Sequence, residues 1–164
     1  MSDLAASPAD NGAAAGQPQL RVLAQYVKDM SFENPGAPQT LRAGQDQPQI
    51  DLQIDVNAMA LADGPGLYEV ALRMRAQGSR GSEVVFIAEL VYAGLFEFQN
   101  ISGPDFEPIL LIECPRTIFP FARRVLADMT REGGHPPLML DPIDFVGLYR
   151  AQMEQRQQQG GVPS

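Results

Sequence analysis

The sequence predicts an α+β domain in which a four-stranded antiparallel sheet is followed by helices that pack on one face of it. Apolar and polar side chains alternate in four successive segments, as in half-buried strands. In the segments that follow, the apolar residues instead recur every three or four positions, as on one face of a helix. The chain of 164 residues, 45% of them hydrophobic, is long enough for one domain with a single core. Because the strands precede the helices, we expect the helices to cover one sheet face and to leave the other open.

The first predicted strand covers residues 19–33. Asn34, Pro35 and Gly36 break it, and a polar stretch then continues to Pro48. This connection is too long for a hairpin, so it must cross over another part of the domain. Alternation places Leu20, Val22, Ala24, Tyr26, Met30 and Phe32 on one face and Arg21, Gln25, Asp29, Ser31 and Glu33 on the other.

Three more strands are predicted over residues 49–57, 67–77 and 83–98. The turn residues 78–81, Gly-Ser-Arg-Gly, join the last two as a hairpin. In the second strand Ile50, Leu52, Ile54 and Val56 alternate with Asp51, Gln53 and Asp55, and in the third Tyr68, Val70, Leu72 and Met74 alternate with Glu69, Arg73 and Arg75. In the fourth, Val84, Phe86, Ala88, Leu90, Tyr92, Phe96 and Phe98 face one side, and Glu83, Val85, Ile87, Glu89, Val91, Leu95 and Glu97 face the other.

Two helices are predicted after the sheet. Apolar residues at positions 118, 121, 122, 125, 126 and 129 form one amphipathic face, with Thr117 as the N-cap, Pro120 in the first turn and Gly133-Gly134 as the C-cap. Asp141 and Pro142 are expected to start the last helix. The shorter apolar segment 106–112 is expected to add one or two helical turns before the long helix.

The open sheet face is predicted to be a docking surface for another protein. Its composition is acidic with apolar islands, and the side chains assigned to it are Asp29, Glu33, Asp51, Asp55, Glu69, Glu83, Glu89 and Glu97 together with Ile87, Val91 and Leu95. The net charge of −8 and the pI near 4.5 favour basic polypeptides as partners and disfavour nucleic acid.

Composition also predicts the limits of the domain and its compartment. Residues 1–18 and 155–164 lack large apolar side chains in a regular period and are predicted to be disordered tails around a domain of residues 19–154. No basic, apolar leader and no apolar run of membrane-spanning length is present, and the single cysteine cannot form an intrachain disulfide. We therefore expect a cytoplasmic protein that does not insert into the membrane.

The sequence offers little for catalysis. His135 is the only imidazole, and a dyad with Cys114 is the one nucleophilic arrangement available, in a small hydrolase. Phosphate-binding glycine loops are absent, and one cysteine with one histidine cannot form a thiolate-imidazole zinc site. The prediction is a non-enzymatic protein without a cofactor or metal.

Four sequence blocks resemble the SecB family of protein-export chaperones. They are YVKDMSFENP at residues 26–35, ELVYAGLF at 89–96, CPRTIFPFAR at 114–123, and GHPPL followed by PIDF between residues 134 and 145. The resemblance extends from about residue 20 to residue 153. It implies a holding chaperone that binds unfolded precursor proteins without ATP and targets them to SecA for export across the inner membrane. It also implies a homotetramer built as a dimer of dimers.

The resemblance further assigns roles to residues. The positions that match the family's binding surface for the basic C-terminal segment of SecA are Asp29, Glu33, Ile87 and Glu89. Ala88, Leu90 and Tyr92 match the family's helix-mediated contact between dimers, so the resemblance assigns them to the oligomer interface. The candidates for an apolar client-binding groove are Phe32, Leu41, Ile50, Leu52, Phe119 and Phe121, and residues 37–48 lack the aromatic residue that family members often have there. An adaptor or antitoxin-linked chaperone of the same fold, with one dedicated partner, is the alternative.

Overall fold

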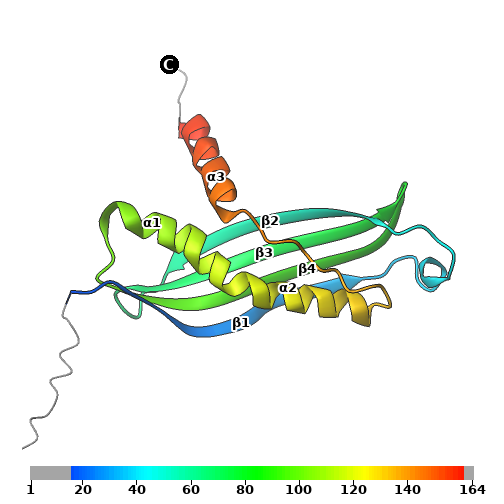
Figure 1. Cartoon of the computed structure of the whole chain (residues 1–164), viewed down its shortest axis with the longest axis horizontal. Coiled ribbons are helices and arrows are strands. Elements are labelled where there is room, and N and C mark those ends of the chain that lie inside the picture. Colours follow the sequence, from blue (N-terminus) through cyan, green and yellow to red (C-terminus); the bar gives the residue numbers. More distant parts are fainter. Residues whose placement is uncertain (1–15, 161–164) are drawn as a thin grey trace, which may run out of the picture.

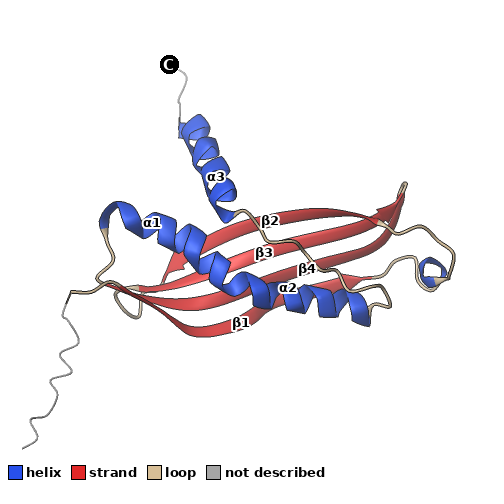
Figure 2. Cartoon of the chain, viewed as in Figure 1, coloured by secondary structure: helices blue, strands red, loops and turns tan. Residues whose placement is uncertain are grey.

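The structure is a computed structural model that describes residues 16–160. It has two layers, an antiparallel sheet with the strand order β1-β4-β3-β2 and helices on one of its faces (Figures 1 and 2). The predicted fold class is confirmed. The strands are β1 (Gln19–Glu33), β2 (Gln49–Ala60), β3 (Leu67–Arg80) and β4 (Glu83–Gln99), and the helices are α1 (Phe106–Pro108), a π-helical turn (Ile109–Glu113), α2 (Cys114–Glu132) and α3 (Phe145–Gly160).

The segment between β1 and β2 crosses over the sheet, as predicted. β1 and β2 form the two opposite edges, so residues 34–48 must pass around one end of β4 and β3 (Figure 1). Arg80 fixes this crossover loop to the end of β3, because its guanidinium donates hydrogen bonds to the carbonyl oxygens of Asp46 and Thr40 and to the Gln45 side chain. The loop is therefore tied to the sheet at Thr40, Gln45 and Asp46.

Two β-bulges in β1 correct the predicted alternation. The register with β4 shifts between Val22 and Ala24 and again between Val27 and Asp29. Each shift inserts an extra residue, which turns the following side chains to the opposite face. Ala24 and Tyr26 therefore lie on the face away from the helices and Gln25 on the helix side, which reverses all three predictions. The second bulge restores the original alternation, so Asp29 pairs with Val91 and Glu33 with Ile87 on the open face.

The core lies between α2 and the inner face of β3 and β4. Its largest fully buried side chains come from both layers and include Leu72, Met74, Leu90, Phe96, Ile118 and Leu126. Burial of each such side chain contributes about 1.5–3 kcal/mol. Gly94 makes room for the Phe96 ring, since a Cβ on Gly94 would lie 2.6 Å from that ring and 3.0 Å from Ile118. These contacts fix α2 across the sheet and leave the opposite face without helices.

The start of the long helix differs from the prediction. Helical backbone runs without interruption from α1 through the π-helical turn into α2, so Thr117 is an internal residue whose hydroxyl donates to the Glu113 carbonyl at 2.8 Å. Pro120 likewise lies inside α2 and not in its first turn. The predicted cap at the other end is confirmed, because Gly134 has a φ of +87° and its N–H donates to the Arg131 carbonyl.

The last helix starts later and ends later than predicted. Its N-terminal cap is Asp144, whose carboxylate accepts a hydrogen bond from the Gly147 N–H at 3.0 Å, and not Asp141. Because Gln, Glu and Arg are good helix formers, α3 continues through Gly160 and includes most of the segment predicted as a tail from residue 155. The predicted tail residues 1–15 and 161–164 lie outside the described residues.

Helix α3 projects away from the sheet (Figure 1), and Arg156 pairs with Glu107 of α1 at 3.1 Å. Within residues 16–160, no helix combines the length and the apolar character that crossing a bilayer requires.

Candidate protein-binding surfaces

The face of the sheet opposite α2 brings together the four residues predicted to bind SecA. Glu33 lies beside Ile87, and the pair Asp29 and Val91 lies on the same face four residues along. Glu89 is between Ile87 and Val91 on β4, so the four side chains occupy neighbouring positions on two adjacent strands, which are about 4.8 Å apart. The three carboxylates are exposed and Ile87 is half-buried. We call this group, Asp29, Glu33, Ile87 and Glu89, the docking face.

The docking face continues into basic residues of β3. The Arg75 Nε atom lies 3.0 Å from Glu89 Oε1, and Arg75 also donates to the Gln77 side chain. A depression of about 120 Å³ contains Arg73 and Arg75 and is bordered by Asp29, Asp55 and Glu89. The alternation of β3 predicts that both arginines face this side, but the pairing of Arg75 with Glu89 depends on the strand register, which the sequence does not give.

A second polar cluster on the same side stabilises the bulged part of β1. Glu69 accepts hydrogen bonds from the Tyr26 hydroxyl and the Lys28 ammonium group. The Lys28 and Tyr26 hydrogen bonds lower the pKa of Glu69, and partial burial together with Glu69 raises the pKa of Tyr26 to about 12. Tyr26 therefore stays protonated and Glu69 ionised near neutral pH. The cluster ties β1 to β3 across β4 through side chains.

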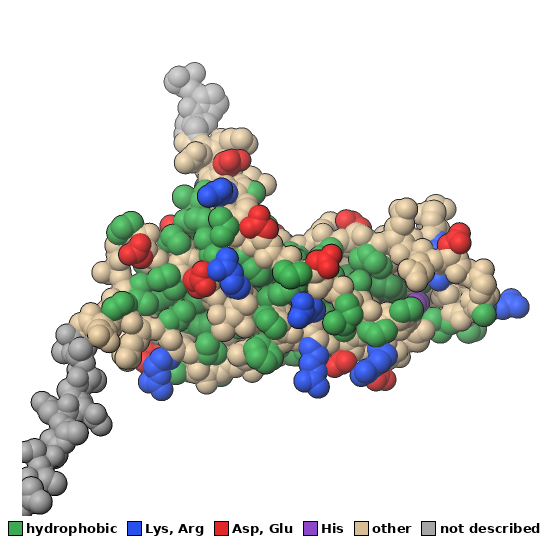
Figure 3. Space-filling model, viewed as in Figure 1, with side chains coloured by type: hydrophobic (Ala, Val, Ile, Leu, Met, Phe, Trp, Pro, Cys, Tyr) green, Lys and Arg blue, Asp and Glu red, His purple; other side chains and the backbone are tan. Residues whose placement is uncertain are grey.

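Two apolar grooves lie on the helix side of the molecule. The first, which we call the α2 groove, has a volume of about 440 Å³ and lies between Met30 and Phe32 of β1 and Val125, Met129 and Gly133 at the end of α2. Asp128 and Glu132 form its acidic rim. Hydrophobic side chains are spread over this side of the molecule, with charged side chains along its lower edge (Figure 3).

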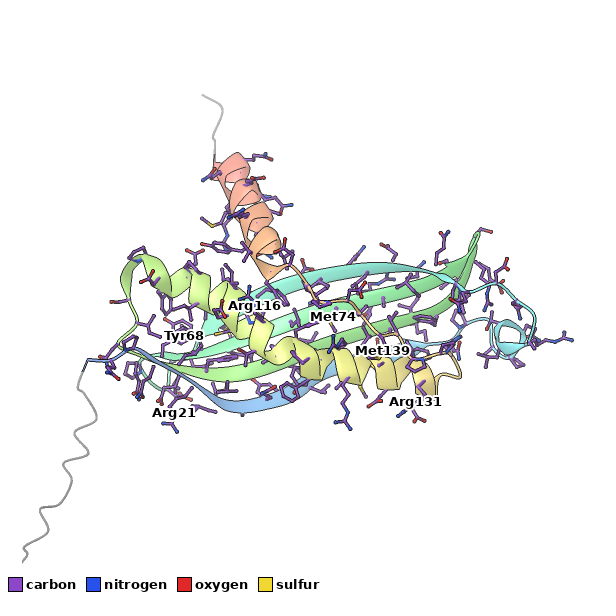
Figure 4. All side chains as sticks on the ribbon, viewed as in Figure 1. Arg21, Tyr68, Met74, Arg116, Arg131 and Met139 are labelled. Carbon is purple, nitrogen blue, oxygen red and sulfur yellow. The ribbon has the colours of Figure 1, made fainter. Side chains whose placement is uncertain are left out.

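The second groove, the loop groove, is about 160 Å³ and lies between the start of β2 and the connector from α2 to α3. Its apolar lining comes from Pro48, Ile50, Phe86, Pro137 and Leu138. The connector is fixed along α2, because the Leu138 N–H donates to the Thr130 hydroxyl and Arg123 donates to the Leu140 carbonyl. Met139 of this connector and Arg131 of α2 are both seen on the helix side in Figure 4.

An aromatic wall of Phe32, Phe86 and His135 separates the two grooves. The Phe86 ring centroid is 6.0 Å from that of Phe32 and 5.0 Å from that of His135. Asn34 fixes the wall, since its amide nitrogen donates to the Gly133 carbonyl at 2.7 Å and its oxygen lies 2.9 Å from His135 Nε2. The Asn34 oxygen is an acceptor, so Nε2 of the neutral imidazole carries the proton. One aromatic cluster therefore forms a side of both grooves.

The six predicted groove residues occupy different environments. Phe32 lines the α2 groove and Ile50 the loop groove. Leu41 is exposed and lies next to Gly134, and Leu52 packs against the core. Phe119 is only 5% exposed because it packs against Phe145, and it lines neither groove. Phe121 is half exposed on α2 and lines neither groove.

The sequence interpretation missed several lining residues of the grooves. Met30 and Met129 line the α2 groove, and Phe86 and His135 border the loop groove. The apolar alternation of β1 and β4 includes Met30 and Phe86, but it identifies them only as inner-face residues. Their place at a groove depends on how the ends of β1, β4 and α2 meet.

Ala88, Leu90 and Tyr92 lie in the core beneath the helix layer. All three belong to the main hydrophobic cluster, and they are almost fully buried within the single chain. They have little surface left for a direct contact with another subunit. Any effect of these residues on assembly must therefore pass through the helix that they support.

The arrangement rules out the Cys114–His135 dyad. Cys114 begins α2 and His135 follows its end, so the 19-residue helix separates them by about 28 Å at 1.5 Å per residue. Burial, with a smaller effect of Glu113, raises the pKa of Cys114 to about 12, which keeps the thiol protonated. Within residues 16–160 no cluster of His, Cys, Asp and Glu side chains is suited to hold a metal ion.

The buried imidazole makes stability depend on pH. Burial, with a smaller effect of Arg80, lowers the pKa of His135 in the folded state below its ordinary value of about 6.5. The unfolded chain then binds the proton more readily, so stability contributed by neutral His135 is present above pH 6.5 and is lost as the pH falls below about 6.5. We expect the urea midpoint to fall between about pH 7.5 and about pH 5.5, and to fall less in His135→Gln. An equal fall in both proteins would contradict this role.

An acidic open sheet face and apolar grooves on the opposite side define a protein-binding domain. The family described as "Preprotein translocase subunit SecB" matches residues 13–156. The protein-export protein SecB of Maricaulis maris is 65% identical over 156 residues, covering 95% of this chain and 89% of the relative. That of Hyphomonas neptunium is 56% identical over 154 residues, covering 93% and 90%.

These relatives identify the family. The chain belongs to the SecB family, and its function is that of a protein-export chaperone. Among solved structures, a SecB-like chaperone of Mycobacterium tuberculosis in complex with an antitoxin peptide has a TM-score of 0.63 at 16% identity, covering 76% of this chain and 90% of that chain. At this low identity, the similarity to the Mycobacterium tuberculosis chaperone shows a shared fold.

Proposed function

We propose that this protein is a cytoplasmic, ATP-independent holding chaperone that binds unfolded precursor proteins in its apolar grooves and delivers them to SecA through the docking face. The observation that carries the proposal is the separation of the two surfaces by one sheet. The grooves lie on the helix side and the exposed carboxylates on the other. A client and SecA can therefore be held at the same time.

Apolar grooves of this kind suit passive binding of extended chains. A slowly folding precursor loses its tendency to aggregate when its apolar segments are covered. The test is light scattering by a refolding precursor without ATP, with the chaperone at one tetramer per client. Suppressed aggregation is expected, and aggregation at the rate of the precursor alone would contradict holding activity.

A homotetramer, assembled as a dimer of dimers, is part of the proposal. Support comes from apolar side chains outside the grooves that are left exposed along edge strand β1 and on α2, where Val22, Leu23, Val27 and Phe121 are between about two-fifths and half exposed. A second copy would cover them, and four copies with a net charge of −8 each carry −32 formal charges. Light scattering in solution should give the mass of four chains, and the mass of one chain would contradict the assembly.

The second candidate is a chaperone with one dedicated partner. It is favoured by the Mycobacterium tuberculosis neighbour, whose structure contains an antitoxin peptide. A pull-down with several unrelated unfolded precursors separates the candidates, because a dedicated chaperone would leave most of them unbound. The high identity to proteins named for protein export favours the general export role.

A further inference from the structure

The docking face contains an internal ion pair that occupies one of its carboxylates. Arg75 Nε donates to Glu89 Oε1 at 3.0 Å, and the Arg75 Nη1 atom lies 3.2 Å from the Gln77 side-chain oxygen. Gln77 is two residues along β3 on the same face, so Arg75 is held from two sides. The guanidinium is therefore fixed beside Glu89.

In the part of the chain that the structure describes, the other two carboxylates of the docking face, those of Asp29 and Glu33, are not held in an ion pair as Glu89 is. Within residues 16–160, neither Asp29 nor Glu33 has a basic side chain within ion-pair distance. The Arg75–Glu89 pair is partly exposed, with 35% of the Arg75 side chain and 52% of the Glu89 side chain accessible. Such a pair is weak and can be exchanged for a partner's cation.

We propose that Arg75 competes with the basic partner for Glu89 and so weakens docking and restricts it to partners that can displace the guanidinium. This inference rests on the proposed docking of SecA. When a lysine or arginine of the partner reaches Glu89, the Arg75 contact must open, and its guanidinium then faces an incoming positive charge. Arg75 is thus a specificity-determining residue that lowers affinity for weakly basic segments.

Arg73 provides a matched control for this competition. It is the neighbouring basic residue of β3 on the same face and borders the same depression, but it lies in the row of Val91 and has no ion pair in residues 16–160. Arg73→Gln and Arg75→Gln change the net charge of the face equally. A difference between the SecA affinities of these two variants therefore reports the effect of the Arg75–Glu89 ion pair and not the effect of the overall charge.

The experiment is a titration of SecA onto the purified chaperone at low ionic strength. Arg75→Gln should tighten binding about two- to fivefold, which is the range expected for release of one exposed ion pair. Arg73→Gln should tighten it less. In a Glu89→Gln background the Arg75→Gln gain should shrink to the Arg73→Gln level, because the competing pair no longer exists.

The outcomes separate this inference from the proposed function. Equal effects of Arg73→Gln and Arg75→Gln, or weaker binding by Arg75→Gln, would overturn the competition while SecA docking by the wild type stands. Failure of the wild type to bind SecA at low ionic strength would overturn both. Thermal unfolding of each variant shows whether the fold is retained, and variants that unfold at the wild-type temperature are compared.

Discussion

Glu89→Lys should weaken SecA binding about 100-fold, because like charges placed across an interface cost several kcal/mol. The substitution removes a carboxylate at the centre of the docking face and leaves Arg75 beside a second cation. The effect should be largest at low ionic strength and shrink as salt screens the surface charges. The measurement is the dissociation constant of SecA at two salt concentrations.

Glu113→Lys is the matched control for this prediction. Glu113 is another exposed glutamate in an ion pair with an arginine, Arg116, but it belongs to the helix side. The charge change is the same, so SecA affinity should remain near that of the wild type. If Glu113→Lys weakens binding as much as Glu89→Lys does, net charge and not the docking face governs association.

Ile50→Asp should lower the affinity for an unfolded precursor about tenfold or more, because one buried aliphatic side chain contributes about 1.5–3 kcal/mol. Ile50 is 39% exposed in the free protein and lines the loop groove beside Phe86. An aspartate there places a charge where a client side chain would be desolvated. The measurement is a titration with a fluorescently labelled unfolded precursor.

Met59→Asp controls for the loss of an apolar residue from the same strand. Met59 is 51% exposed near the other end of β2, where it pairs with Glu69 on the face away from the helices. Precursor binding should be unchanged in this variant. A similar loss in both variants would mean that the edge of the sheet, and not the loop groove, receives the client.

The sequence predicted the strands well because Gly, Pro and polar breaks mark their ends. It also placed Asp29 and Glu33 on the open face, yet this depended on two bulges whose effects cancel. Tyr26, between the bulges, was assigned to the wrong face, since alternation counts residues and does not show an inserted one.

The less predictable features all depend on contacts between distant segments. The Arg75–Glu89 pair requires the register of β3 and β4, and the aromatic wall requires His135 after α2 to meet Phe32 at the end of β1. The helical period places Phe121 on the apolar face of α2 and leaves Phe119 out of it, yet Phe119 is 5% exposed and Phe121 is 50% exposed. Helical periodicity gives a face only approximately, so a residue at its margin cannot be assigned from sequence.

Formation of a ternary complex tests the central claim most directly, since grooves and docking face lie on opposite sides of one sheet. A labelled precursor is first bound to the chaperone, SecA is then added at low ionic strength, and sedimentation velocity follows the label. The account predicts that the label moves into a heavier species containing all three proteins, with a SecA affinity close to that of the client-free chaperone. Release of the precursor as SecA binds, in proportion to the SecA bound, would show that the two partners share one surface.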